Sequence, residues 1–110
     1  MKRAQAKAAR KRLAAAEKLL AAASSAAFYE EVERALRSFL EAKLNAPLSG
    51  LTRDALDAVM AEQKVPAAER TRVLAVFETC DLGRYAPGMG EPSARNRALD
   101  DAAAAMEAWS

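Results

Sequence analysis

Seven apolar residues between positions 28 and 44 recur at intervals of three and four, and this spacing restricts the fold more than any other feature. They are Phe28, Val32, Ala35, Leu36, Phe39, Leu40 and Leu44. Such a period puts apolar side chains on one face of an α-helix, whereas a half-buried strand would alternate every second residue. Alanine makes up about a quarter of the chain, and a 5% aromatic share with only four glycines argues against a β-sandwich or barrel. The sequence therefore predicts an all-α fold.

Apolar spacing and helix-end residues predict a small bundle of about five helices. We expect helices over about residues 3–23, from 28 to about 45, from 53 to a turn at 65, from 66 to 80, and from 92 or 93 onward. Ser24 and Ser25 should interrupt the first two, which then form either a helical hairpin or one long broken helix. Asn45 is expected to end the second helix, and Thr52 should cap the third. The expected buried residues of the last three helices are Leu56, Val59, Met60, Val73, Val76, Phe77, Cys80, Leu99, Ala102, Ala103, Met106 and Trp109.

The formal net charge of +2 conceals a strong asymmetry along the chain. Residues 1–27 have a net charge of +6, and the remaining residues have −4. The first helix should carry a basic face formed by Arg3, Lys7, Arg10, Lys11 and Lys18. This face would bind an anionic partner, such as a lipid surface, nucleic acid or an acidic protein, or would be an ordinary solvated surface. We divide the chain into a basic amphipathic arm, residues 1–24, and a compact helical domain, residues 25–110.

The residue types required for most active sites are missing. The chain has no histidine, the commonest general base and transition-metal ligand. The single cysteine, Cys80, continues an apolar stripe, where burial should raise the pKa of its thiol and make it unreactive. One cysteine without histidine also falls short of a zinc site. The sequence predicts a non-enzymatic protein with no catalytic residue, no cofactor and no metal.

The same features bear on location and on nucleic acid. A lone cysteine forms no internal disulfide, which favours a reducing compartment, and no apolar run is long enough to cross a membrane. The chain by itself is therefore expected to be soluble. The turn at 65–66 is similar to that of a helix-turn-helix, but Glu69 and Glu78 offset Arg70 and Arg72. Nucleic acid is not the expected partner; any binding would be nonspecific and would use the basic arm.

The segment from 81 to 92 contains three glycines and two prolines and is expected to be a loop. Because loops on a rigid scaffold often make contacts, an interaction site around Arg84, Tyr85 and Met89 is one interpretation. In the other, Asp81 caps or pairs with Arg84 while Tyr85 packs beneath the loop. The candidate residues of this loop signature are Cys80, Asp81, Arg84, Tyr85 and Pro87.

Three stretches of this sequence are similar to one known family. The strings are FYEEVERALRSFLEAKL, LTRDALDAVM and VLAVFETCDLGRYAP. Their most particular marks are the Phe28–Tyr29 opening, the Leu51–Thr52 cap, and the Cys80–Asp81 pair with the loop from Arg84 to Pro87. Together they resemble the C-terminal domain of BatD-type aerotolerance (oxygen-tolerance) membrane proteins of bacteria. The resemblance covers about residues 13–109.

That resemblance implies a location and partners. The chain would be the cytoplasmic tail of an anchored protein at the bacterial inner membrane, with its membrane span outside this chain. Partners implied by the family are von Willebrand A-domain membrane proteins and a MoxR-type AAA+ ATPase. The hypothesis from sequence is thus a helical protein-interaction domain, with nonspecific binding of nucleic acid or anionic lipid by the basic helix as the alternative.

Overall fold

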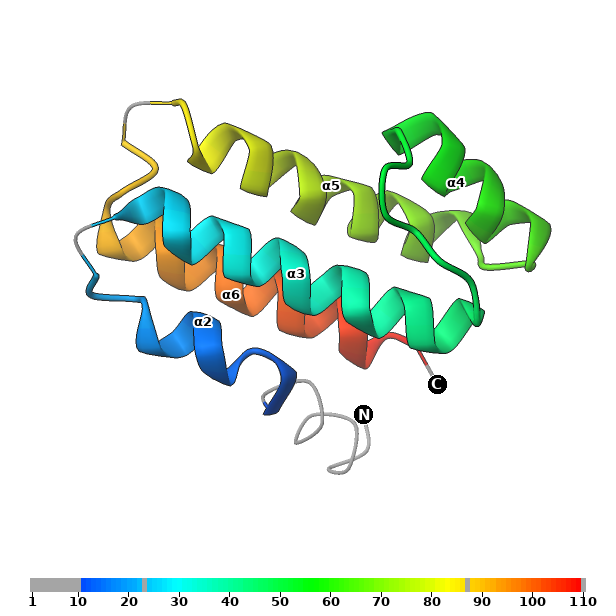
Figure 1. The fold of residues 1–110 in the computed structure, drawn as a ribbon, viewed down its shortest axis with the longest axis horizontal. Helices are drawn as coiled ribbons and strands as arrows, with labels where there is room; N and C mark the ends of the chain where they lie inside the picture. The colour runs from blue at the N-terminus through cyan, green and yellow to red at the C-terminus, as the bar shows by residue number, and fades with distance from the viewer. Residues whose placement is uncertain (1–10, 23, 87, 110) are drawn as a thin grey trace.

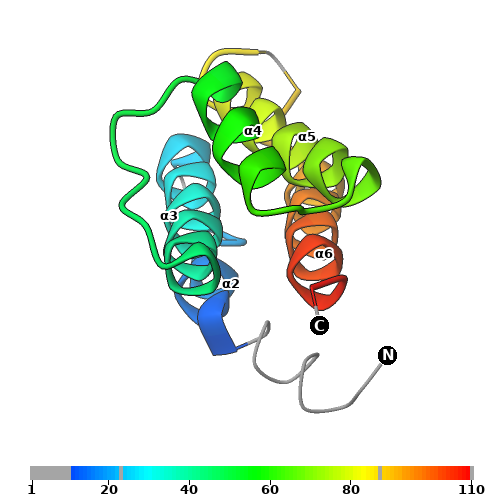
Figure 2. The same cartoon turned by 90° about the vertical axis from the view of Figure 1, so that its right-hand side faces the viewer.

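The computed structural model describes residues 11–22, 24–86 and 88–109, and every regular element within them is helical. The elements are α2 (Ala14–Lys18), α3 (Ser25–Leu44), α4 (Arg53–Glu62), α5 (Ala67–Gly83) and α6 (Pro92–Glu107). Helices α3, α5 and α6 pack against one another, while α2 lies on α3 and α4 lies on α5 (Figure 1). The end-on view in Figure 2 shows α3 and α6 side by side with α4 and α5 above them. The prediction of a small all-α bundle is confirmed.

Helix α3 is the central element, and its two ends are set by local chemistry. The Ser24 hydroxyl accepts a hydrogen bond from the Ala27 amide at 3.2 Å, which satisfies one of the unpaired N–H groups of the first turn. Asn45 ends the helix in the left-handed conformation with φ 51°. The expected break at 24–25 is thus real, and α2 and α3 form an antiparallel hairpin (Figure 1). Thr52 caps α4 in the same way through the Ala55 amide.

One continuous core runs through all these helices. The predicted apolar residues of α3, α5 and α6 are buried, with Ala35 and Trp109 partly buried at its edge. Leu13 and Ala16 of the first segment are each only 1% exposed and belong to the same core. The described part of the basic arm therefore packs on the helical domain through its apolar side.

Within the described residues, the first helical segment ends earlier than expected. Residues 3–10 lie outside the described residues, and α2 ends at Lys18 instead of continuing to 23. The guanidinium of Arg95, on α6, donates from Nη1 to the carbonyl oxygens of Leu19, Leu20 and Ala22 at 3.1, 3.1 and 2.7 Å. The buried cation satisfies these carbonyls where the helix does not continue, together with the Ala22 amide, which also donates to the Leu19 carbonyl, so the chain can turn toward α3.

Helix α5 extends further than expected, because residues 81–83 are helical and not part of the loop. Gly83, the last residue of α5, lies against the ring of Tyr29 on α3, and a Cβ at position 83 would collide with that ring. Glycine is thus placed here for space and not to end the helix. Tyr29 is fully buried, and its hydroxyl donates to the Met89 carbonyl at 2.7 Å, which holds the following loop against α3. None of the helices in the described ranges combines the length and apolar character needed to span a bilayer.

The contact between Gly83 and Tyr29 should reverse the usual effect of a glycine-to-alanine substitution on helix stability. In an unhindered helix, glycine to alanine stabilises by roughly 0.5–1 kcal/mol. Gly83→Ala should instead destabilise the protein by about 1–3 kcal/mol, because the added methyl group overpacks against Tyr29. Urea unfolding of both proteins measures the difference, and repeating it in a Tyr29→Leu background should reduce it. A Gly83→Ala variant as stable as the wild type would contradict the packing described here.

Candidate interaction site

The structure separates the members of the loop signature. Cys80 points into the core and is fully buried, whereas Asp81 is half-exposed. Arg84 and Tyr85 follow directly after α5, and Tyr85 is 84% exposed. Pro87 lies outside the described residues. The four described residues of the loop signature therefore face three different environments.

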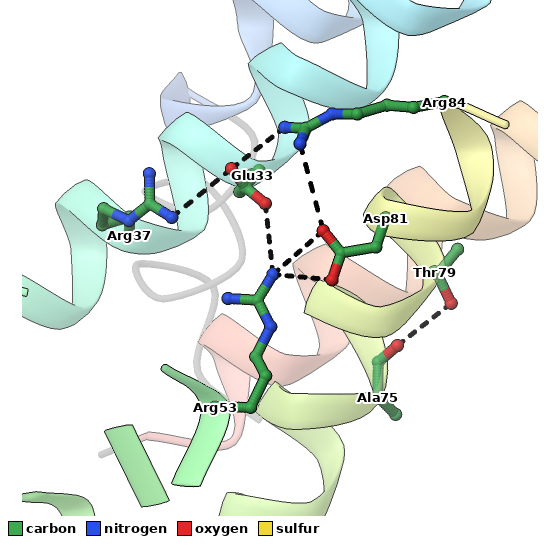
Figure 3. A network of polar contacts seen from close by, with 7 residues as sticks. All are labelled: Glu33, Arg37, Arg53, Ala75, Thr79, Asp81 and Arg84. Carbon is green, nitrogen blue, oxygen red and sulfur yellow. Dashed lines mark hydrogen bonds and ion pairs between the residues drawn. The ribbon is translucent and has the colours of Figure 1, made fainter. Parts of the chain in front are cut away.

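Asp81 and Arg84 belong to a network of five charged side chains from α3, α4 and α5, drawn in Figure 3. We call Glu33, Arg37, Arg53, Asp81 and Arg84 the charge cluster. The Glu33 carboxylate lies at its centre and faces three guanidinium groups: Nη2 of Arg84 at 3.1 Å and Nη2 of Arg53 and Arg37 at 3.4 Å each. The residue is only 8% exposed, so its charge is largely removed from water and depends on these partners.

Asp81 forms the second negative centre of the cluster. Its carboxylate oxygens lie 2.9 and 3.1 Å from Nη2 of Arg53, and a longer ion pair of 4.0 Å joins it to Arg84. Pairing of Asp81 with Arg84 is thus confirmed, although Arg53 is the closer partner. Sequence reasoning missed Glu33, Arg37 and Arg53 as members of this site. Only the four-residue spacing of Glu33 and Arg37 was a local signal, and it occurs on many solvated helices.

Two pKa shifts follow from this arrangement. Burial by itself lowers the pKa of Arg84, but the adjacent Glu33 carboxylate outweighs burial and raises it, so this guanidinium remains charged. Burial, reinforced by the negative charge of Glu33, raises the pKa of the Cys80 thiol to about 12. The thiol is neutral at physiological pH, as expected for a cysteine that packs in the core.

An exposed apolar edge adjoins the cluster at the end of α5. Leu82 is 51% exposed and Tyr85 84%, and they are the large apolar side chains that the described residues leave in solvent. The interpretation that Tyr85 packs beneath the loop is wrong, because Tyr29 occupies that position. Met89, expected to contribute to a contact, is instead partly buried against the core. We call Leu82 and Tyr85 the apolar edge.

Only part of the predicted basic face can be placed. Arg3, Lys7 and Arg10 lie outside the described residues, whereas Lys11 and Lys18 are exposed. Arg12 is not among the residues predicted for that face. Its guanidinium carbon lies 5.6 Å from the centroid of the Phe39 ring on α3. The two placed lysines are accessible to an anionic surface.

The described residues offer little for a cofactor. No group of three or more cysteine, aspartate and glutamate side chains among them could hold a metal ion. The surface hollows there include one of about 350 Å³ lined in part by Lys43, Val65 and Trp109, and one of about 440 Å³ between α5 and α6. Both are open to solvent.

No protein-family model, curated protein or solved structure matches the chain.

The charge cluster leads to a stability prediction. Glu33→Gln keeps the shape of the side chain but removes the charge that three guanidinium groups share, so it should destabilise the fold by about 2–4 kcal/mol. Glu31→Gln is a matched control, because Glu31 forms a surface ion pair with the exposed Arg34 and its loss should change stability by less than about 0.5 kcal/mol. Urea unfolding at neutral pH measures both. Equal effects of the two substitutions would contradict the central role of Glu33.

A second prediction concerns pH and uses the Cys80→Ala variant as its reference. The folded state holds the thiol neutral with a pKa of about 12, whereas the unfolded thiol ionises near pH 9.0. Folding is therefore favoured by the neutral thiol below pH 9, and this contribution is lost as the pH rises toward 12. The stability difference between wild type and Cys80→Ala should be constant below pH 9 and fall by about 1.4 kcal/mol per pH unit above it. A difference independent of pH up to 11 would mean that the thiol is not shielded.

Proposed function

We propose that this chain is a non-enzymatic protein-interaction domain that binds its partner through the apolar edge. The exposure of Leu82 and Tyr85, next to each other on one end of a packed bundle, carries this proposal. Large apolar side chains left in water indicate contact surfaces more often when they lie together than when they are scattered. Tyrosine is also among the residues that contribute most to binding when a partner covers them.

The surroundings of the edge support the same function. Arg84 lies between the two residues in sequence and is held by Glu33 at 3.1 Å. The segment that follows is held by the hydrogen bond from Tyr29 to the Met89 carbonyl. A contact surface supported in this way loses little conformational entropy on binding, which favours affinity.

The resemblance to BatD-type proteins supports a more specific proposal. The domain would lie on the cytoplasmic face of the bacterial inner membrane, as the tail of a protein anchored by a span outside this chain. Its partner would be a von Willebrand A-domain membrane protein or a MoxR-type AAA+ ATPase. The exposed Lys11 and Lys18 favour a second role for the first segment, contact with anionic lipid headgroups.

The test is binding of purified partner domains to wild type and to the double variant Leu82→Ser, Tyr85→Ser, measured by titration calorimetry. Loss of two interface anchors should weaken binding by about tenfold or more. Because both side chains are exposed, the thermal midpoint should change little. The control is Arg72→Ser with Glu78→Ser, two exposed positions on the same helix.

Equal binding by the edge variant and the control would rule out the apolar edge as the contact. A parallel titration with anionic vesicles separates the lipid role. If Lys11 and Lys18 contact lipid, their replacement by glutamine should abolish vesicle binding without changing the affinity for a protein partner.

A further inference from the structure

We infer that the charge cluster is a binding site for a carboxylate side chain, and that the partner therefore presents an acidic segment. The residues that would hold the carboxylate are Arg37 and Arg53. This inference rests on the proposed function and adds to it the chemical class of the partner.

The two guanidinium groups are only partly used within the protein. Each contacts the cluster's carboxylates through Nη2, and Figure 3 shows their other nitrogens directed away from Glu33 and Asp81. Nε and Nη1 of Arg37 and Arg53 make no hydrogen bond to any described residue, and the two side chains are 32% and 36% exposed. These N–H groups are not used by the described residues, and the one-third exposure of both side chains leaves room for an incoming acceptor.

The Phe77 ring fixes the orientation of both groups. The Arg53 guanidinium carbon lies 4.6 Å from the ring centroid, and that of Arg37 lies 5.9 Å from it. A guanidinium held over an aromatic face keeps its N–H donors at the edge, where they can bind a planar carboxylate. Since the site is already ordered, a ligand would pay little for arranging it.

The charge balance favours a carboxylate over a phosphate. Within the cluster three guanidinium groups face two carboxylates, a net charge of +1. The exposed Glu30 carboxylate also acts on Arg84 from outside the cluster and reduces this positive excess. One further carboxylate would neutralise it. A phosphate carries nearly two negative charges, which is more than the net positive charge of the cluster. Glu33 and Asp81 would therefore repel it at close range.

The site is continuous with the apolar edge. Nη2 of Arg53 lies 2.9 Å from the Asp81 carboxylate. Tyr85 follows Asp81 by four residues, in the turn after α5. The Tyr85 amide donates to the Leu82 carbonyl at 3.1 Å, so Tyr85 stays close to the end of α5 that carries Asp81. An acidic residue and an apolar residue a few positions apart in one partner segment would thus reach Arg53 and Tyr85 together.

The test uses the synthetic peptide acetyl-LEELEE-amide and NMR spectra of the arginine Nε–Hε groups. The signals of Arg37 and Arg53 should shift in a saturable way. The neutral peptide acetyl-LQQLQQ-amide should bind at least about fivefold more weakly than the acidic peptide. Arg37→Gln should weaken binding of the acidic peptide about fivefold, because it removes one of the two cations. Arg34→Gln, an exposed arginine on the same helix, is the matched control and should have no effect.

The possible outcomes separate this inference from the proposed function. Equal binding of the two peptides, or tighter binding of inorganic phosphate than of the acidic peptide, would overturn the carboxylate site. Shifts at Tyr85 without shifts at Arg37 and Arg53 would overturn it too, while leaving the apolar edge as the contact. If the arginine signals shift and Arg37→Gln weakens binding of the acidic peptide about fivefold while Arg34→Gln does not, the inference holds whether or not the edge takes part.

Discussion

The buried carboxylate of Glu33 is the interaction on which the arrangement of α3, α4 and α5 depends. It receives guanidinium groups from its own helix, from the first residue of α4 and from the residue that follows α5. Removing any such charge from water is costly unless it is paired, so the three helices must meet in one geometry for the charges to be satisfied. The same constraint holds Arg37 and Arg53 through Nη2 while about a third of each side chain stays exposed.

Close packing of a chain rich in alanine creates the second constraint. Small side chains allow helices to approach closely, so a few large residues determine how they fit. Tyr29 shows this most clearly, since its ring lies against Gly83 and its hydroxyl binds the Met89 carbonyl. Arg95 performs a similar role for α2 by binding three backbone carbonyls at its C-terminal end. Tyr29 and Arg95 are buried by these contacts, whereas Leu82 and Tyr85 remain exposed to solvent.

The candidate site was only partly predictable. The spacing of Asp81 and Arg84 indicated a pair, and that pair exists at 4.0 Å. Glu33 and Arg53 could not be assigned to it, because they come from helices that are distant in sequence and their own surroundings resemble ordinary helix surfaces. The exposure of Tyr85 also could not be predicted, since two tyrosines were available to pack beneath the loop and Tyr29 occupies that place.

The sequence by itself determined the helical class, the break at Ser24, the end of α3 at Asn45 and the apolar faces. These features depend on periodicity and capping, which act over a few residues. Tertiary structure alone decided that α5 extends to Gly83, that α2 ends at Lys18 and that five charged residues form one cluster. Those outcomes depend on contacts between residues far apart in the chain: 51 positions separate Glu33 from Arg84, and 60 separate Tyr29 from Met89. Local sequence patterns carry no information about such pairings, because the energy that selects them is gained only when the helices pack.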